Sequence, residues 1–431
     1  MGWRRVSTPV IGYVGMTHLG LCSAVAAASK GFTTRAVDRD AALVARLAAG
    51  QLPVVEPGLD DLLRDHRERI RFSAEAGELG KCDVVYVAPD VPTDDTGKSN
   101  LAVLDALVEF ALASTRPDAV VVILSQVPPG YTRARQRAGR LLFYQVETLI
   151  FGRAVERATQ PERFIVGCPD PAEPLPSAMH AFLQGFGAPI LPMRLESAEL
   201  CKIAINCCLV SSISVANTLA ELCEGIGANW SEIVPALKLD RRIGAHAYLA
   251  PGLGFAGGNL ERDLATVIRL ADGIGSDAGV VKAWIANSRH RKRWAADTIR
   301  KVVLDKNPAA VIAVWGLAYK ENTASVKNSP ALATVAALPD ARLVLHDPVV
   351  TAAAVQHPKA VAASDPLAAL KDADALMILT PWPHYRAIAP GDIAAIMRGR
   401  VVLDPYAVLG PQAARRAGLE YHTLGRASVE V

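Results

Sequence analysis

Several features of specialised protein classes are missing from this sequence. Its seven cysteines form no CxxC pair and have no histidine partner at the spacing of a zinc site. A net charge of +3 is too small for the basic field of a nucleic-acid-binding protein. No uninterrupted run reaches the ~18 apolar residues that a membrane span requires. We therefore expect buried thiols in a reducing compartment, with no metal, no nucleic-acid partner and no membrane span.

Charge and targeting signals are also sparse. The first ten residues, MGWRRVSTPV, contain two arginines but lack the apolar segment of a signal peptide, which predicts a cytoplasmic protein. The one dense basic cluster is RHRKR at 289–293, inside a helical pattern from Val280 to Val303. We interpret this cluster as a solvated helix face or a subunit edge rather than a phosphate-binding patch.

The chain contains 431 residues, of which 51% are hydrophobic, so it can form two or three domains with separate cores. Short β-branched runs alternate with Ala/Leu-rich helical stretches in the first part and again near the end. This alternation is typical of parallel sheets buried on both faces. Between them, helices extend from Glu196 to about Lys301. We expect an α/β fold with two Rossmann-like doubly wound domains, 1–190 and 305–431, joined by a helical domain at 191–304.

A glycine-rich turn follows the first predicted strand, in the segment VIGYVGMTHLGL. The dinucleotide fingerprint has an acidic, ribose-binding residue about 20 residues after its turn, and Asp38 occupies that position. Counting back selects GMTHLG at 15–20 as the turn, which leaves Gly12 in the strand and Thr17 at the middle glycine. Because amides at a helix start bind pyrophosphate, the pattern predicts a dinucleotide site. The alternative is a tight turn with a packing glycine.

The acidic residue also indicates which dinucleotide binds. A carboxylate at Asp38 repels a 2′-phosphate, so NAD is favoured over NADP, although the adjacent Arg39 weakens this preference. The predicted cofactor-binding residues are Gly15, Thr17, His18, Leu19, Gly20, Asp38, Arg39, Ser125 and Gln126.

Ordered motifs continue along the rest of the chain. They are LAAGQLPVVEPGLDDLL (47–63), SQVPPGYT (125–132), VETLIFGRA (146–154), ESAELCKIAINCC (196–208), RIG (242–244), GFAGGNLERD (254–263), WGLAYKENTASVKNSPAL (315–332), LHDPVV (345–350) and LTPWPHY (379–385). In this order they resemble the UDP-glucose/GDP-mannose dehydrogenase family over nearly the full length. The resemblance implies an NAD-binding domain, a central dimerisation domain of a homodimer and a nucleotide-sugar-binding domain. It also implies oxidation of a sugar CH₂OH to a carboxylate in two hydride transfers.

One position departs from that chemistry. Family members hold the aldehyde on a cysteine, and the aligned residue here is Asn259, whose amide is not a nucleophile. Cys207 and Cys208 are turned by about 100° and 200° from Asn206 around their helix, and Cys201 also lies off that face. We therefore interpret these cysteines as core residues rather than as a relocated nucleophile.

Other family positions differ or survive. The resemblance places Gln126 at a threonine, Val146 at a proline, Phe151 at an acidic residue, Ala324 and Ser325 at two aspartates, and Lys327 at an arginine. The family's residue type is kept at Glu147, Lys202, Asn206 and Asp263. Together with Asn259, these residues form the predicted catalytic set. Such groups can take a proton from an alcohol, stabilise an alkoxide and orient water. Alternatively, Glu147 is a surface charge and Lys202 and Asp263 form a structural ion pair.

The resemblance also indicates substrate-binding residues. Tyr319 and Lys320 are placed like residues that contact a nucleotide diphosphate, and Arg242 like an arginine that reaches the sugar of a partner subunit. Glycines in the 252–258 stretch permit main chain to surround a sugar. The full predicted set is Arg242, Tyr248, Gly254, Phe255, Gly257, Tyr319 and Lys320.

The leading hypothesis is an NAD-dependent dehydrogenase that carries out a two-electron oxidation of a nucleotide-activated sugar. Loss of the cysteine leaves two alternatives open. One is a catalytically impaired module that binds NAD and nucleotide sugar. The other is full four-electron oxidation to a uronate by a cysteine-independent route. The sequence does not specify the base, the sugar or the pathway.

Overall fold

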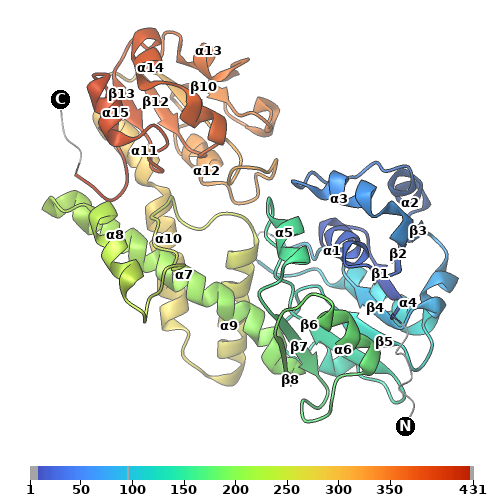
Figure 1. Ribbon diagram of the computed structural model, residues 1–431. Helices are drawn as coiled ribbons and strands as arrows, with labels where there is room; N and C mark the ends of the chain where they lie inside the picture. Colours follow the sequence, from blue (N-terminus) through green and yellow to red (C-terminus); the bar gives the residue numbers. More distant parts are fainter. Residues whose placement is uncertain (1–7, 95–96, 428–431) are drawn as a thin grey trace. The chain divides into compact units, whose positions relative to one another are not determined.

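The computed structural model describes residues 8–94 and 97–427. The chain divides into two compact units, residues 1–205 and 206–431, and the division falls inside helix α7 (Leu195–Ile226). The signal-peptide prediction rests on the first ten residues, and residues 1–7 lie outside the described range. Each unit is described below by itself (Figure 1).

Unit 1 is built on an eight-stranded sheet with the order β3-β2-β1-β4-β5-β6-β7-β8. The strands are β1 (Ile11–Val14), β2 (Thr34–Val37), β3 (Ile70–Ser73), β4 (Val84–Val87), β5 (Val120–Ile123), β6 (Leu141–Gln145), β7 (Phe164–Cys168) and β8 (Ile190–Arg194). The central strands IGYV, VVYV and VVVI are buried along their whole length because helices cover both faces. One pairing differs from the parallel expectation: β7 runs antiparallel to β6.

Helices of the described part of unit 1 accompany this sheet ahead of α7. They are α1 (His18–Ser29), α2 (Ala41–Ala48), α3 (Leu59–Asp65), α4 (Ala102–Ser114), α5 (Ala154–Thr159) and α6 (Ser177–Gln184), with short 3₁₀ turns at Arg67–Arg69, Ala76–Lys81 and Arg133–Arg135. Helix α1, HLGLCSAVAAAS, is buried on almost every side, and its small residues let it lie close to the sheet. Its first turn follows the carboxyl end of β1, which is where doubly wound sheets bind ligands.

Unit 2 begins with helices. The larger part of α7 comes first. It is followed by α8 (Trp230–Leu239), α9 (Asn259–Ile274), α10 (Gly279–Lys292) and α11 (Trp294–Ile299), and a π turn at Arg300–Leu304 ends this region. Helix α9 has the strong two-sided character of a surface helix, with Leu264 and Ala271 buried. Helix α7 is the one helix in the described parts of the chain that is long and apolar enough to cross a membrane by length and composition alone, a test that core helices of globular proteins also pass.

The second sheet of unit 2 is fully parallel, with the order β11-β10-β9-β12-β13-β14. Its strands are β9 (Val311–Trp315), β10 (Arg342–His346), β11 (Ala360–Ala362), β12 (Ala375–Ile378), β13 (Val401–Leu403) and β14 (Glu420–His422). Helices α12 (Pro330–Ala336), α13 (Pro366–Leu370), α14 (Pro390–Ile396) and α15 (Pro411–Arg416) and 3₁₀ turns at Ala352–Ala354 and Pro383–Ala387 connect them. All tryptophans of the described residues belong to unit 2: Trp230, Trp284, Trp294, Trp315 and Trp382.

This architecture confirms the predicted α/β class with two Rossmann-like sheets and a helical region between them in the sequence. The three domain boundaries given above stay a prediction. Two local predictions need correction. Cys208 is exposed rather than buried. The basic cluster is not one solvated face, because Arg291 is only 1% exposed and pairs with acidic residues of α7.

Candidate functional site

The turn between β1 and α1 has the backbone of a phosphate-binding loop. Gly12 lies inside β1, Gly15 has φ +89°, and α1 begins at His18 with Thr17 as its N-cap. A Cβ on Gly20 would lie 1.9 Å from the carbonyl oxygen of Gly15, so only glycine permits this approach of helix to turn. The first amides of α1, which have no partner within the helix, therefore lie at the edge of the sheet where a dinucleotide fold receives a pyrophosphate.

Asp38 follows β2 and lies beside this turn. Its carboxylate accepts hydrogen bonds from the backbone N–H groups of Met16 (2.7 Å) and Asp40 (3.0 Å), which fix it next to the glycine turn. The Arg39 guanidinium lies 5.9 Å from the centre of the Phe110 ring. A cradle that a Cβ would fill, helix amides and a positioned carboxylate together fit a dinucleotide with a free ribose hydroxyl.

The remaining predicted cofactor residues are buried. Leu19 packs in the core of unit 1, so it can offer a ligand only its backbone. Ser125 and Gln126 follow β5, and the Ser125 hydroxyl donates to the carbonyl oxygen of Pro89 at 2.5 Å. The side chain of His18 turns into the protein, where it stacks on Phe151 with ring centres 4.3 Å apart.

Two acidic residues at this turn were missed by the sequence analysis. Glu56 is buried, and its carboxylate accepts from the N–H groups of Gly152 (3.0 Å) and Ala154 (2.7 Å) and lies 2.9 Å from His18 Nε2. Asp90 follows β4 and accepts from the N–H of His18 at 3.0 Å. In the sequence, only the EPG motif at 56–58 indicated Glu56, and no motif indicated Asp90.

Two predicted catalytic residues pair within unit 1. Lys202 Nζ on α7 lies 3.1 Å from Glu147 Oε2, and both side chains are largely buried, at 14% and 17% exposure. The second Glu147 oxygen accepts from the N–H of Leu149 at 2.5 Å. Glu147 is therefore not a surface charge, and its partner is Lys202. An ammonium paired with a carboxylate can hold or pass on a proton.

The other three predicted catalytic residues lie in unit 2. Asn206, one turn after Lys202 on α7, donates from Nδ2 to Asp263 Oδ2 at 2.5 Å, and both side chains are buried. Arg262 Nε lies 3.3 Å from Asp263 Oδ1. Asn259 is the exposed first residue of α9, one turn before Asp263, so the two side chains lie on the same face of the helix.

The neighbouring thiols do not replace a nucleophile at Asn259. Burial raises the pKa of the Cys207 thiol to about 11, and the negative charge of Asp263 adds to this effect. At neutral pH Cys207 is therefore protonated, and a thiol rather than a thiolate is a weak nucleophile. Cys201 is partly buried, whereas Cys208 is exposed.

The glycine loop at 252–258 is held by residues from several elements of unit 2. Ser288 of α10 accepts the N–H of Phe255 at 2.7 Å, and a Cβ on Gly254 (φ +77°) would lie 2.6 Å from the Ser288 carbonyl oxygen. Asn328 donates to the carbonyl oxygen of Gly257 at 3.2 Å. The Tyr319 ring lies against Gly257, and burial raises the pKa of Tyr319 to about 12. This loop and Tyr319 are thus brought together.

The remaining predicted substrate residues are placed as follows. Lys320 Nζ lies 5.7 Å from the centre of the Tyr319 ring. Arg242 is 89% exposed at its side chain and pairs with Asp240 at 2.6 Å, and Tyr248 is half exposed. Both lie in the segment between α8 and the glycine loop. Exposure of this kind leaves the Arg242 guanidinium accessible to a ligand or to a second chain.

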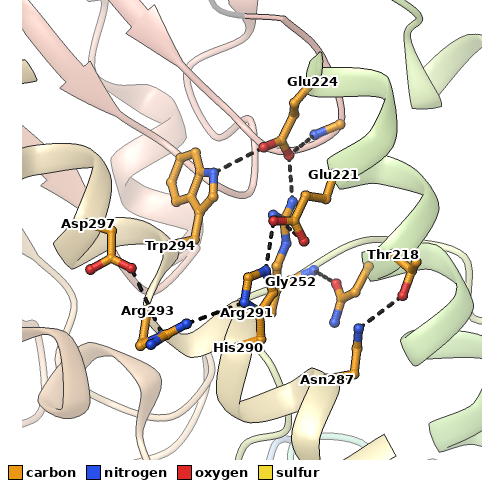
Figure 2. A network of polar contacts seen from close by, with 12 residues as sticks. Thr218, Glu221, Glu224, Gly252, Asn287, His290, Arg291, Arg293, Trp294 and Asp297 are labelled. Carbon is orange, nitrogen blue, oxygen red and sulfur yellow. Dashed lines mark hydrogen bonds and ion pairs between the residues drawn. The ribbon is translucent and has the colours of Figure 1, made fainter. Parts of the chain in front are cut away.

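Polar contacts fasten the start of the glycine loop to α7, and a network beside it joins α7 to α10 and α11 (Figure 2). Asn217 Oδ1 accepts the N–H of Gly252 at 2.8 Å. Nearby, the buried Arg291 lies 2.5 Å from Glu224 and 3.6 Å from Glu221. Glu224 also accepts from the Trp294 indole N–H at 3.3 Å. Within residues 8–94 and 97–427, no group of three or more His, Cys, Asp or Glu residues is placed to hold a metal ion.

Comparisons with known proteins agree along the whole chain. Three models of the UDP-glucose/GDP-mannose dehydrogenase family match: the NAD binding domain at 10–181, the central domain at 196–289 and the UDP binding domain at 313–411. The UDP-glucose 6-dehydrogenase of Pseudomonas aeruginosa is 31% identical and is covered over 96% of each chain. TuaD, a UDP-glucose 6-dehydrogenase of Bacillus subtilis, is 29% identical over 97% of this chain and 94% of its own.

Solved structures give the same picture. A UDP-glucose dehydrogenase from Pyrobaculum islandicum matches with a TM-score of 0.86 and 28% identity, over 99% of this chain and 100% of that chain. The fold is also shared with a UDP-D-ManNAc dehydrogenase from Pyrococcus horikoshii, with a TM-score of 0.82 at 22% identity, over 97% and 100% of the two chains.

Proposed function

Because the chain belongs to the UDP-glucose/GDP-mannose dehydrogenase family and is an NAD-dependent dehydrogenase, we propose that it oxidises a nucleotide-activated sugar by two electrons. The reaction converts a sugar CH₂OH and NAD⁺ into an aldehyde, NADH and a proton. The proposal is supported by Asn259, the exposed first residue of α9, which the motif resemblance aligns with the family's cysteine. Without a thiol the aldehyde has no covalent partner there, and release becomes the simplest outcome.

The chain's own groups account for proton removal. We assign the Lys202–Glu147 pair to the alcohol proton, because these partly buried groups are paired at 3.1 Å, so a proton taken up by one can pass to the other. Asn206 and Asp263 supply a fixed amide and a fixed carboxylate, since each is buried and hydrogen-bonded to the other. Preorganised polar groups of this kind stabilise an alkoxide as its charge develops.

NAD supplies the hydride acceptor when it is bound. The first turn of α1 would hold its pyrophosphate, and Asp38 would hold the adenosine ribose. Gln126 and Ser125 lie after β5, at the same edge of the sheet. For the substrate, Tyr319, Lys320 and the glycine loop are assigned to the nucleotide sugar, with UDP-glucose as the first candidate because the relatives named above act on it.

The proposal extends to assembly and location. We propose a homodimer formed through α7, where Val215, Leu219, Leu222 and Ile226 are exposed at 51%, 40%, 54% and 75%. Their spacing of four, three and four residues puts them on one helix face, and such an apolar row favours a protein partner. Arg242 then serves the second subunit. A cytoplasmic location is supported by seven free cysteines, which suit a reducing compartment.

The test is the number of NADH molecules formed for each sugar nucleotide consumed, with purified protein, NAD, UDP-glucose and an aldehyde trap. We expect one NADH and one trapped aldehyde. K202M serves as the control, with activity lowered by about 10² or more because the Lys202–Glu147 pair assigned to the alcohol proton is broken. Two NADH per sugar would contradict the two-electron reaction and indicate a cysteine-independent route to a uronate.

The panel then covers other UDP-, GDP- and CDP-sugars. If none yields NADH although calorimetry detects both NAD and a sugar nucleotide bound, the protein is a binding module rather than an enzyme. N259C provides a further comparison. Restoring the thiol is expected to raise the NADH count above that of the parent protein, since the aldehyde can then be held for a second oxidation.

A further inference from the structure

We propose that Asp90 competes with the cofactor's pyrophosphate for the first turn of α1 and thereby sets the affinity for NAD. This inference rests on NAD binding at the β1–α1 turn. It concerns a residue that the dinucleotide fingerprint does not contain, and it assigns Asp90 a role in cofactor affinity rather than in chemistry.

The contact itself is direct. Asp90 Oδ2 lies 3.0 Å from the backbone nitrogen of His18, the first residue of α1. That N–H is one of the amides that no residue within the helix can pair with, and it points where a dinucleotide pyrophosphate is received. A carboxylate and a pyrophosphate are both anions, so they cannot share one amide. NAD binding must therefore move the Asp90 carboxylate away.

Thr17 explains why the carboxylate stays at this place. The backbone N–H of Asp90 donates to Thr17 Oγ1 at 2.8 Å, while the Asp90 carboxylate accepts from the next residue, His18. The two contacts clamp the segment after β4 onto the N-terminus of α1. Thr17 stands where the fingerprint has its middle glycine, so the unusual side chain and the competing carboxylate are parts of one arrangement.

The arrangement is reversible. Asp90 is exposed, so its side chain can rotate into water without breaking a packed core. A carboxylate at a helix N-terminus is stabilised by the helix dipole, and this stabilisation is lost when the pyrophosphate takes its place. The pyrophosphate also experiences the nearby negative charge. Both effects weaken NAD binding, and both disappear when the carboxylate is made neutral.

The test compares NAD affinity in the parent protein, D90N and D90A by calorimetry. D90N keeps an oxygen that can accept the His18 N–H, so helix capping and folding are retained while the charge is removed. We expect both variants to bind NAD about 3- to 10-fold more tightly. D118N is the matched control, because Asp118 precedes β5 at the opposite edge of the sheet and is 79% exposed.

Two further readouts identify the cause. The gain in D90N should shrink between low salt and about 1 M salt, because charge repulsion is screened. ADP should gain affinity like NAD, whereas adenosine, followed by NMR titration, should not. Unchanged NAD affinity in D90N and D90A, or an equal gain in D118N, overturns the proposal while leaving NAD binding intact. No NAD binding in any of these proteins overturns both the proposal and the cofactor assignment.

Discussion

At the scale of single residues, Glu56 shows how one buried carboxylate organises the surroundings of the glycine turn. It joins His18 on α1 to the backbone of Gly152 and Ala154, in the segment that follows Glu147. Helix α1 of the glycine turn and the segment that follows Glu147 are therefore fixed to the same side chain. Any shift of Glu56 moves both.

We expect E56Q to destabilise the protein by about 1–3 kcal/mol, because the glutamine NH₂ faces hydrogen-bond donors and leaves one of them buried without an acceptor. Urea unfolding of the two proteins measures the difference. E68Q is the control, since the Glu68 side chain is 69% exposed. Equal stability of E56Q and E68Q would show that Glu56 is dispensable for this part of the fold.

Residue-level predictability depended on local spacing. Asp38 lies at a fixed distance from the glycine turn, so the sequence alone indicated it, whereas Lys202 and Asn206 were indicated by the resemblance of their segment to the family. Asp90 and Glu56 act across 72 and 38 positions from His18. Contacts of that kind arise only when strands and helices are assembled, and no periodicity in the sequence encodes them.

At the scale of elements, the α7–α10 network is the clearest departure from the sequence-based interpretation. RHRKR suggests a charged surface because five polar residues occur in succession, but a helix turns them in different directions. Arg291 points toward α7, where Glu221 and Glu224 pair with it (Figure 2). Arg289 and Arg293 remain exposed. The composition of such a run therefore does not indicate which of its residues faces the core.

We expect R291M to lower the free energy of unfolding by about 2–4 kcal/mol, because Glu224 then loses the partner of a partly buried ion pair. Thermal unfolding of unit 2 reports the change. R289M removes the same charge from the exposed neighbouring position and should be nearly neutral. A comparable loss in both variants would mean that net charge, rather than the buried pair, matters.

The antiparallel pairing of β6 and β7 is another feature that the elements reveal. Strand periodicity is the same in parallel and antiparallel sheets, so the runs LLFYQ and FIVGC carried no information on direction. The connection between them contains Glu147 and α5 and returns to the same edge without a crossover helix over the sheet. That return brings Glu147 to the carboxyl end of β6.

At the scale of the whole molecule, repetition of the βαβ pattern made the fold class predictable, because each repeat indicates the same local geometry. Assembly with a second chain is not predictable in the same way. An exposed apolar helix face shows one side of an interface but does not show which surface covers it. The row Val215, Leu219, Leu222 and Ile226 carries the homodimer proposal.

We expect light scattering to find a dimer for the parent protein and a monomer for the double variant L219E/L222E, because two buried carboxylates without partners oppose association. V55E is the control: Val55 is 97% exposed in unit 1, so a carboxylate added there should leave the dimer intact. A dimer that persists in L219E/L222E would move the interface away from α7.

The placement of the tryptophans gives the molecule an optical asymmetry. Of the six in the sequence, five lie at position 230 or later, in unit 2, and the sixth is Trp3. In a W3F background, emission excited at a wavelength that tryptophan absorbs and tyrosine does not would therefore originate from the second unit alone, and the unit with the dinucleotide turn would be dark. Emission and the circular dichroism of the whole chain would then resolve the melting of the two units without any added label.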